Sequence, residues 1–243
     1  MIRRLPLLRT QRTIAGELLR LDRTLDQACV MIDQAHRFAQ AAIAEDQSEA
    51  PPAPPIACKA GCAWCCQSRV IVTEAEAIRI GAYLRAHLDA AELNAVRARV
   101  AAADDATHGQ SSDERFEARV PCPLLHEQMC IVHEVRPLAC VGYNSADASV
   151  CERASREGNP RDVIPAYMPQ VEAAGAIQMG LIQGMRDQAL RASALELNAA
   201  VRIALERDGV ADRWLAGRHP FAPAVVEDAT RNLDQLLARV IGN

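Results

Sequence analysis

Nine cysteines carry most of the chemistry that this sequence can offer. Four of them stand within nine residues, in the stretch Cys58-Lys-Ala-Gly-Cys62-Ala-Trp-Cys65-Cys66. Thiolates at such short spacings can converge on one zinc ion or hold iron, because a tight turn aims successive sulfurs at one point. Gly61 lies within that turn, where glycine adopts a positive φ at little cost. The spacing therefore predicts a metal centre that begins with this cluster.

The cysteines further along the chain supply the other half of the predicted centre. Cys122, Cys130 and Cys140 follow the first cluster by more than 50 residues, so a shared metal would staple two distant segments together and contribute directly to folding. Cys151 is the weakest ligand candidate of the set. Cys29 stands alone in a regular helical pattern and is expected to be a buried, inert thiol.

The ligand chemistry leaves several alternatives open. A disulfide scaffold is disfavoured, because nine is an odd number and no export signal precedes the cysteines. Thiolate sets suit both zinc and iron, including a [4Fe–4S] cluster, and the cysteines could form one site or two. His126 and His133 are also spaced for ligation, but thiolates are already in excess. Adjacent residues such as Cys65 and Cys66 are expected to point apart.

A centre built from four thiolates and one divalent ion carries a net charge of about −2. Three basic residues lie close enough in sequence to offset that charge, namely Lys59, Arg69 and Arg136.

In this order, the cysteines resemble the YkgJ-type cysteine-cluster family, described as a zinc- or iron-chelating domain. The matching residues are Cys58, Cys62, Cys65 and Cys66, then Cys122-Pro123-Leu124-Leu125, Cys130-Ile131-Val132-His133 and Arg136-Pro137-Leu138-Ala139-Cys140. The resemblance covers about residues 56–145 and implies metal chelation. Here His133 replaces a usual aromatic residue, Val141 replaces a common arginine, and Cys151 lies outside the shared pattern.

The alternative function is an iron–sulfur enzyme that uses S-adenosylmethionine, for methyl transfer or radical chemistry, or that transfers electrons. Some relatives, the flagellin lysine methylases, resemble such proteins, and Cys58, Cys62 and Cys65 also match the radical S-adenosylmethionine spacing. That chemistry requires a barrel of alternating strands and helices after the motif. Thr73-Glu-Ala-Glu76 instead opens a helix as a capping box, so chelation without an assigned catalytic residue is the leading interpretation.

The composition predicts a mainly α fold, a helical domain wrapped around a cysteine-rich, loop-rich metal-binding centre. Half of the 243 residues are hydrophobic, but only 3% are aromatic, which favours helices over sheets. The net charge of −4 gives no reason to expect nucleic acid or a membrane surface as a partner. No segment resembles an export signal or a membrane span, so we expect a cytoplasmic protein.

The chain divides into four predicted parts. These are an amphipathic N-terminal helix in 1–50, a proline-rich connector in 51–55, the cysteine-cluster domain in 56–155 and a helical region packed on it in 156–243. Apolar residues at alternating four- and three-residue spacing predict one long helix over 14–39. Its stripe is expected to pack on the core, with a homodimeric or partner-binding coiled coil as the alternative.

The remaining helices are predicted from their caps and apolar patterns. We expect them at 74–88, 90–103, 168–190, 194–207 and 224–240, with Asp89 as the cap between the first two and a second capping box at Ser193-Ala-Leu-Glu196. A polar loop is expected at 108–113 and irregular chain over 122–165. Gly180 and Gly184 lie one turn apart, which indicates close helix packing. Trp214 and Phe221 are expected to anchor the last helices.

Overall fold

The computed structural model describes residues 4–241, which form eleven α-helices and four short strands. The amino-terminal half contains α1 (Leu5–Leu21), α2 (Leu25–Glu49), β1 (Ile71–Val72), α3 (Glu74–His87), α4 (Ala90–Thr107) and α5 (Ser112–Glu117). The middle contains β2 (Leu125–His126), β3 (Met129–Cys130), η2 (His133–Val135), α6 (Leu138–Gly142) and α7 (Ala148–Glu157). The remainder contains α8 (Met168–Asp187), β4 (Leu195–Glu196), α9 (Leu197–Glu206), α10 (Val210–Leu215), η3 (Ala222–Ala224) and α11 (Glu227–Ile241). The mainly helical fold class is therefore confirmed.

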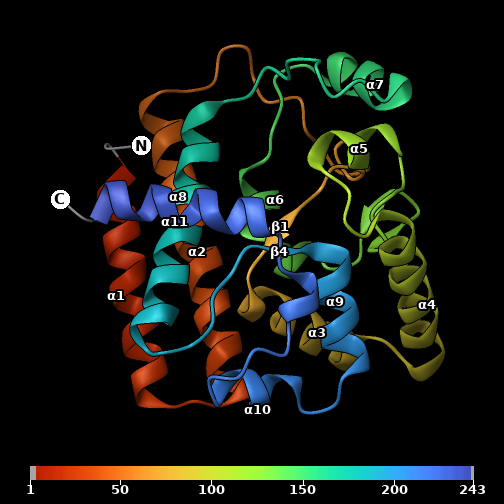
Figure 1. Ribbon diagram of the computed structural model, residues 1–243. Helices are drawn as coiled ribbons and strands as arrows, with labels where there is room; N and C mark the ends of the chain where they lie inside the picture. The colour runs from red at the N-terminus through yellow and green to blue at the C-terminus, as the bar shows by residue number, and fades with distance from the viewer. Residues whose placement is uncertain (1–3, 242–243) are drawn as a thin grey trace.

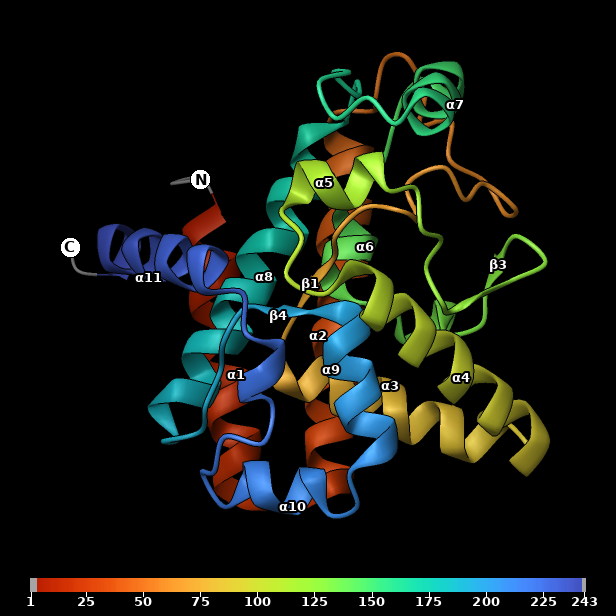
Figure 2. The same ribbon diagram turned by 45° about the vertical axis from the view of Figure 1, so that its right-hand side comes forward.

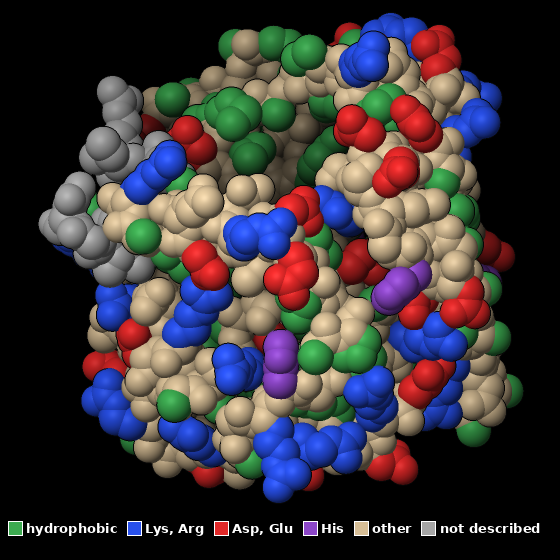
Figure 3. Space-filling view, in the orientation of Figure 1, with side chains coloured by type: hydrophobic (Ala, Val, Ile, Leu, Met, Phe, Trp, Pro, Cys, Tyr) green, Lys and Arg blue, Asp and Glu red, His purple; other side chains and the backbone are tan. Residues whose placement is uncertain are grey.

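Helices α1, α2 and α8 form a bundle on one side of the molecule, and α3, α4 and α9 pack on the other side (Figure 1). One buried hydrophobic core runs through both groups. The antiparallel pair β1–β4 joins them, with Ile71 opposite Glu196 and Val72 opposite Leu195. On the face shown in Figure 3, a hollow with hydrophobic walls lies above α11, and charges of both signs are interspersed over the rest.

Strands are too short in the described chain for the barrel that radical S-adenosylmethionine chemistry requires. Each of the four named strands in residues 4–241 has two residues. The segment after the first cysteine cluster instead leads through β1 directly into α3. No helix in the same range has the length and apolar character needed to cross a bilayer.

The predicted single helix over 14–39 is wrong, because the chain breaks between α1 and α2. Thr24 is extended and caps α2, with its hydroxyl accepting a hydrogen bond from the Gln27 amide. The predicted stripe is nevertheless buried along α2, at Ala28, Ile32 and Ala35, where it packs within the chain. Its packing on the core is thus confirmed for α2, whereas the predicted coiled-coil partner stays a prediction.

Local capping signals place some helices correctly and misplace another. Thr73 and Glu76 form the predicted capping box of α3, and Asp89 caps α4 as expected. The box expected at Ser193 is wrong, since Glu196 is the residue that caps α9. Residues 195–196 pair with β1 as a strand, and this pairing delays the start of the helix.

The region 122–165, which the sequence predicts to be irregular, contains the short helices α6 and α7. The loop expected after residue 108 likewise includes α5. Both anchoring aromatic residues behave as predicted, because Trp214 and Phe221 are completely buried.

Two glycines of α8 allow α1 to approach closely, as their spacing predicts. A Cβ at Gly184 would lie 2.6 Å from the Arg12 carbonyl oxygen and 2.7 Å from Ala15 Cβ. A Cβ at Gly180 would collide with the backbone of Leu8. Gly175, on the same helix, is exposed and would meet nothing within 4 Å.

We predict opposite effects for the same substitution at two of these positions. Gly184→Ala should lower the free energy of unfolding by about 1–3 kcal/mol, because the added methyl group meets backbone. Gly175→Ala should raise it by about 0.5–1 kcal/mol, because alanine is the better helix former and the site is open. Denaturant unfolding of both variants measures the difference, and equal effects would contradict the close packing.

A buried carboxylate at the start of α3 predicts a dependence of stability on pH. Glu74 has no exposed surface, and its Oε2 accepts a hydrogen bond of 3.1 Å from the Ser193 amide. Burial raises its pKa from 4.5 to about 7, against smaller opposing effects of its hydrogen bonds and Arg186. The folded chain therefore holds this proton more tightly than the unfolded chain, and it loses stability as the pH rises from about 4.5 through 7.

Glu74→Gln should remove that loss, because glutamine can accept the Ser193 hydrogen bond without ionising. We expect the variant to be more stable than wild type by about 3 kcal/mol at pH 8 and about 1 kcal/mol at pH 5. Unfolding curves for both proteins at matched pH values provide the test. A difference that does not change with pH would show that Glu74 is not the titrating group.

Candidate metal centre

The first cysteine cluster is a loop of two consecutive tight turns. The Cys62 amide donates to the Lys59 carbonyl at 3.0 Å, and the Cys66 amide donates to the Ala63 carbonyl at 3.0 Å. Gly61 has a φ of +79°, as the motif predicts. No residue in 56–66 is fully buried. This loop therefore gains its shape from turns and neighbouring segments rather than from a hydrophobic core.

Helix α7 is held against the loop and brings Cys151 to it. The Gln67 side-chain amide donates to the Ser155 carbonyl at 3.3 Å, and the Ser155 hydroxyl donates to Gln67 Oε1 at 3.1 Å. The Arg156 guanidinium lies over the Trp64 ring, 5.4 Å from its centre. Figure 2 shows the loop between α7 and the β2–β3 hairpin.

Four thiols form what we call the outer group, made of Cys58, Cys62, Cys65 and Cys151. Burial raises the pKa of the Cys58 and Cys151 thiols, and the nearby thiols of Cys62 and Cys65 raise it further. Cys58 is exposed, and its sulfur lies 3.9 Å from the Ser145 carbonyl oxygen. The structure thus places Cys151 beside the first cluster, although it was the weakest candidate from the sequence.

We define an inner group of four cysteines, made of Cys122, Cys130 and Cys140, whose thiols lie near one another, and Cys66, whose backbone is bonded to that of Cys122. The Cys122 amide donates to the Cys66 carbonyl at 2.6 Å, which joins the two distant segments. Cys130 lies on β3 and pairs with Leu125 in the hairpin. Burial raises the pKa of Cys122 to about 12, with a further contribution from Cys130. Burial also raises the pKa of Cys140, and Cys122, Cys65 and Cys130 add to that effect.

Cys65 connects the two groups. A hydrogen bond with the Cys66 thiol and burial both raise the pKa of Cys65 far above its usual value. The expectation that these adjacent side chains point apart is therefore wrong. The backbone here forms two turns, in place of the extended strand in which adjacent side chains alternate.

Of the basic residues predicted to offset the charge, Arg136 lies near the thiols. Its charge lowers the pKa of Cys65, Cys130 and Cys140, against the larger effects that raise it. One of its terminal nitrogens lies 2.6 Å from His133 Nε2, so that ring nitrogen faces a cation rather than the sulfurs. Arg69 instead lies 3.7 Å from the Asp228 carboxylate.

Two residues beside the thiols carry no signal in the sequence pattern. Tyr143 is 45% exposed. Burial of its hydroxyl and the nearby thiols of Cys65, Cys151 and Cys58 raise its pKa to about 12. The Ser145 carbonyl also accepts a hydrogen bond of 2.8 Å from the Ala57 amide, which holds the start of the cluster. Only the folding of the chain after Cys140 reveals that these residues belong to the site.

Cys29 does not belong to either group. It lies on α2 and is partly buried, so it is less enclosed than the sequence predicts. Desolvation raises its pKa, and its charged neighbours are Arg79, Asp33 and Asp26 rather than other thiols.

The gathered sulfurs do not form a finished coordination shell. Within residues 4–241, no three side chains of His, Cys, Asp or Glu are placed to share one ion. The donor set nevertheless fits zinc or iron, since Cys58, Cys122, Cys140 and Cys151 each have other thiols among their ionisable neighbours. Ionised thiols so close together repel one another unless a cation lies between them.

Glu76 fixes the position of the segment that carries Cys140. This carboxylate is 1% exposed and accepts four hydrogen bonds. Its Oε1 accepts from the Leu138 amide at 2.8 Å, at the first residue of α6. Its Oε2 accepts from the Thr73 amide and hydroxyl and from the Gln178 side chain. One side chain of α3 therefore joins α6 and α8 next to the inner group.

The comparison with protein families gives a match over residues 57–160. These residues match the family model described as "CxxCxxCC: Putative zinc- or iron-chelating domain". The predicted resemblance to such a domain is confirmed, and the match extends beyond the expected residue 145 to include Cys151. Neither the curated proteins nor the solved structures gave a match to this chain.

The hydrogen bonds of Glu76 predict a large loss of stability from a small chemical change. Glu76→Gln places a donor amide against backbone and side-chain donors, so the free energy of unfolding should fall by about 2–4 kcal/mol. Glu92→Gln is the matched control, because Glu92 closes the same kind of capping box on α4 at an exposed position. There the change should cost less than about 1 kcal/mol.

Thermal and denaturant unfolding of the two variants provide the comparison. Metal content should also fall in Glu76→Gln, because the Leu138–Cys140 segment loses its anchor. Equal stability losses in the two variants would show that the buried Glu76 stabilises the fold no more than the exposed Glu92 does.

Proposed function

Since residues 57–160 match a zinc- or iron-chelating domain, we propose that this chain binds zinc or iron through its clustered cysteine thiolates. The observation that carries the proposal is the gathering of eight thiols from three separate segments, with thiols as one another's ionisable neighbours. We assign the ligands to two centres, one in the outer group and one in the inner group. When bound, the metal supplies the positive charge that the gathered thiolates share.

The assignment to two centres rests on the number and neighbours of the thiols. Eight thiolates exceed the four that a tetrahedral ion accepts. The neighbours of Cys58 and Cys151 are Cys62 and Cys65, whereas the first thiol neighbours of Cys140 and Cys122 come from the inner group. Cys65 lies between the groups, and we assign it to the outer one to give each centre four sulfurs.

The two centres differ in access to solvent, which supports different roles. Cys58 in the outer group is exposed, so an ion held there is open to exchange with other ligands. The inner group joins the first cluster to the β2–β3 hairpin and α6, where an ion would contribute to folding. We therefore propose that the inner metal is structural and that the outer metal can be exchanged.

The decisive experiment measures metal content and stability in matched cysteine variants. Protein purified without oxygen should contain about two metal ions per chain by mass spectrometry if each centre holds one ion. Cys62→Ala should lose the outer metal and melt at a lower temperature. Cys140→Ala should lose the inner metal with a larger fall in melting temperature, because that centre staples distant segments. Cys29→Ala should keep both metals.

The absorption spectrum of the same sample identifies the metal. A colourless sample with zinc indicates zinc centres, and a broad band near about 400 nm with matching iron and sulfide indicates iron–sulfur centres. Full metal content and unchanged melting in Cys62→Ala would overturn the proposal that the cluster binds metal. Loss of all metal in both Cys62→Ala and Cys140→Ala would show that the cysteines form one centre rather than two.

A further inference from the structure

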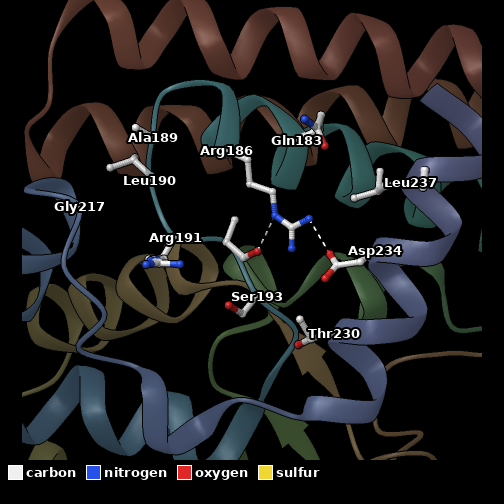
Figure 4. Close-up of a pocket in the computed structure, with 12 residues that line it drawn as sticks. Gln183, Arg186, Ala189, Leu190, Arg191, Ser193, Gly217, Thr230, Asp234 and Leu237 are labelled. Atoms are coloured by element: carbon white, nitrogen blue, oxygen red, sulfur yellow. Dashed lines mark hydrogen bonds and ion pairs between the residues drawn. The ribbon is translucent and has the colours of Figure 1, made fainter. Parts of the chain in front are cut away.

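A cavity of about 870 Å³ opens between the end of α8, the segment 189–193 and α11 (Figure 4). None of the cysteines lines it, so it is separate from the metal centre. Its lining includes Arg186 and Gln183 from α8, Arg191 and Ser193 from the connecting segment, and Thr230 from α11, among other residues.

Hydrogen-bond donors without partners face this cavity. Arg186 donates from Nε to the Ala192 carbonyl at 2.9 Å and from Nη1 to Asp234 at 2.7 Å, which fixes its plane. Its second terminal nitrogen has no hydrogen bond or ion pair with residues 4–241, and Figure 4 shows it between α8 and α11. The Thr230 hydroxyl oxygen accepts from the Ala194 amide at 3.2 Å, which leaves its hydrogen available to donate.

Each acidic group around the cavity already accepts a hydrogen bond through at least one oxygen. Asp234 is paired with Arg186, and Asp187 is paired with Arg12 at 2.6 Å. Glu74 lies behind Ser193, whose amide donates to it. Arg191, at the edge of the cavity, forms no ion pair with the described residues and adds positive charge. The free polar groups therefore suit a ligand that is anionic and accepts hydrogen bonds.

The size and the remaining walls indicate that this ligand has an organic body. The cavity is within the usual range for small-molecule sites, roughly 300–1,000 Å³, and is much larger than one inorganic anion. Leu190, Leu237, Ala189 and Ala238 supply apolar surface beside the polar groups. An apolar body would contact these side chains while its charged end meets Arg186 and Thr230.

We propose that this cavity binds a small organic anion, with a carboxylate or phosphate group attached to an apolar body. The fixed Arg186 plane presents a charge-assisted donor to the anionic end, and the Thr230 hydroxyl supplies a second donor. The leucine and alanine side chains favour a short hydrocarbon chain over a fully polar one. This site is independent of the proposed metal centres.

Calorimetric titration of the full, metal-loaded chain tests the proposal with four probes. Hexanoate and hexyl phosphate should bind saturably at one site per chain, and their relative affinities distinguish a carboxylate ligand from a phosphate ligand. Hexanol and inorganic phosphate should each bind at least about tenfold more weakly, because hexanol lacks the anionic group and inorganic phosphate lacks the apolar chain. Absence of saturable binding by both hexyl anions would overturn the proposal, as would equal binding of hexanol.

Two variants locate the binding. Ala238→Trp fills the cavity from an exposed position and should weaken hexyl-anion binding by at least about tenfold. Arg186→Lys keeps the charge beside Asp234 but removes the second guanidinium nitrogen, and it should weaken binding by about fivefold or more. Unchanged melting temperatures and metal content show that the variants remain folded. Wild-type affinity in folded Ala238→Trp would place the ligand elsewhere and overturn the assignment.

Discussion

The carboxylate of Glu76 is the interaction on which the two halves of this fold depend. It is almost completely buried, yet its two oxygens accept hydrogen bonds from residues that belong to three different parts of the chain. An anion in that position is tolerable only because each oxygen meets donors that would otherwise be unsatisfied. The capping box that starts α3 thus also fixes the start of α6 and the middle of α8. As a result, the helix that carries Cys140 takes its place from the core rather than from the thiols themselves.

The two sides of that link are stabilised in different ways. The bundle of α1, α2 and α8 depends on close contact, with Gly180 and Gly184 allowing backbone to meet backbone. The cysteine loop at 56–66 has no fully buried residue and depends on turns, a few side-chain hydrogen bonds and one cation–π contact. Such a segment gains little from hydrophobic burial. A shared metal ion would stabilise this loop, as hydrophobic burial stabilises the bundle.

The parts that could be predicted from the sequence are those governed by local chemistry. The capping residues Thr73 and Asp89 and the turn at Gly61 act through neighbours within one or two turns. The one-turn spacing of Gly180 and Gly184 is also a local pattern, although the helix that they contact, α1, is distant in sequence. The cysteine spacing likewise indicated the family to which residues 57–160 are matched. What the sequence could not predict depends on contacts between distant segments. The strand pairing of 71–72 with 195–196 displaced the predicted start of α9, and the break before Thr24 divided a continuous apolar stripe.

The same distinction explains the site residues that the sequence missed or ranked low. Cys151 lies beside the first cluster because Gln67 and Ser155 hold α7 against the loop, 88 positions apart in the chain. Tyr143 and Ser145 reach the thiols because α6 is docked by Glu76 on one side and by Gln170, whose side chain donates to the Val141 carbonyl at 2.9 Å, on the other. A spacing pattern records which thiols can meet through a local turn. It does not record which thiols are brought together by the packing of the helices that carry them, and in this protein that packing assembles half of the candidate centre.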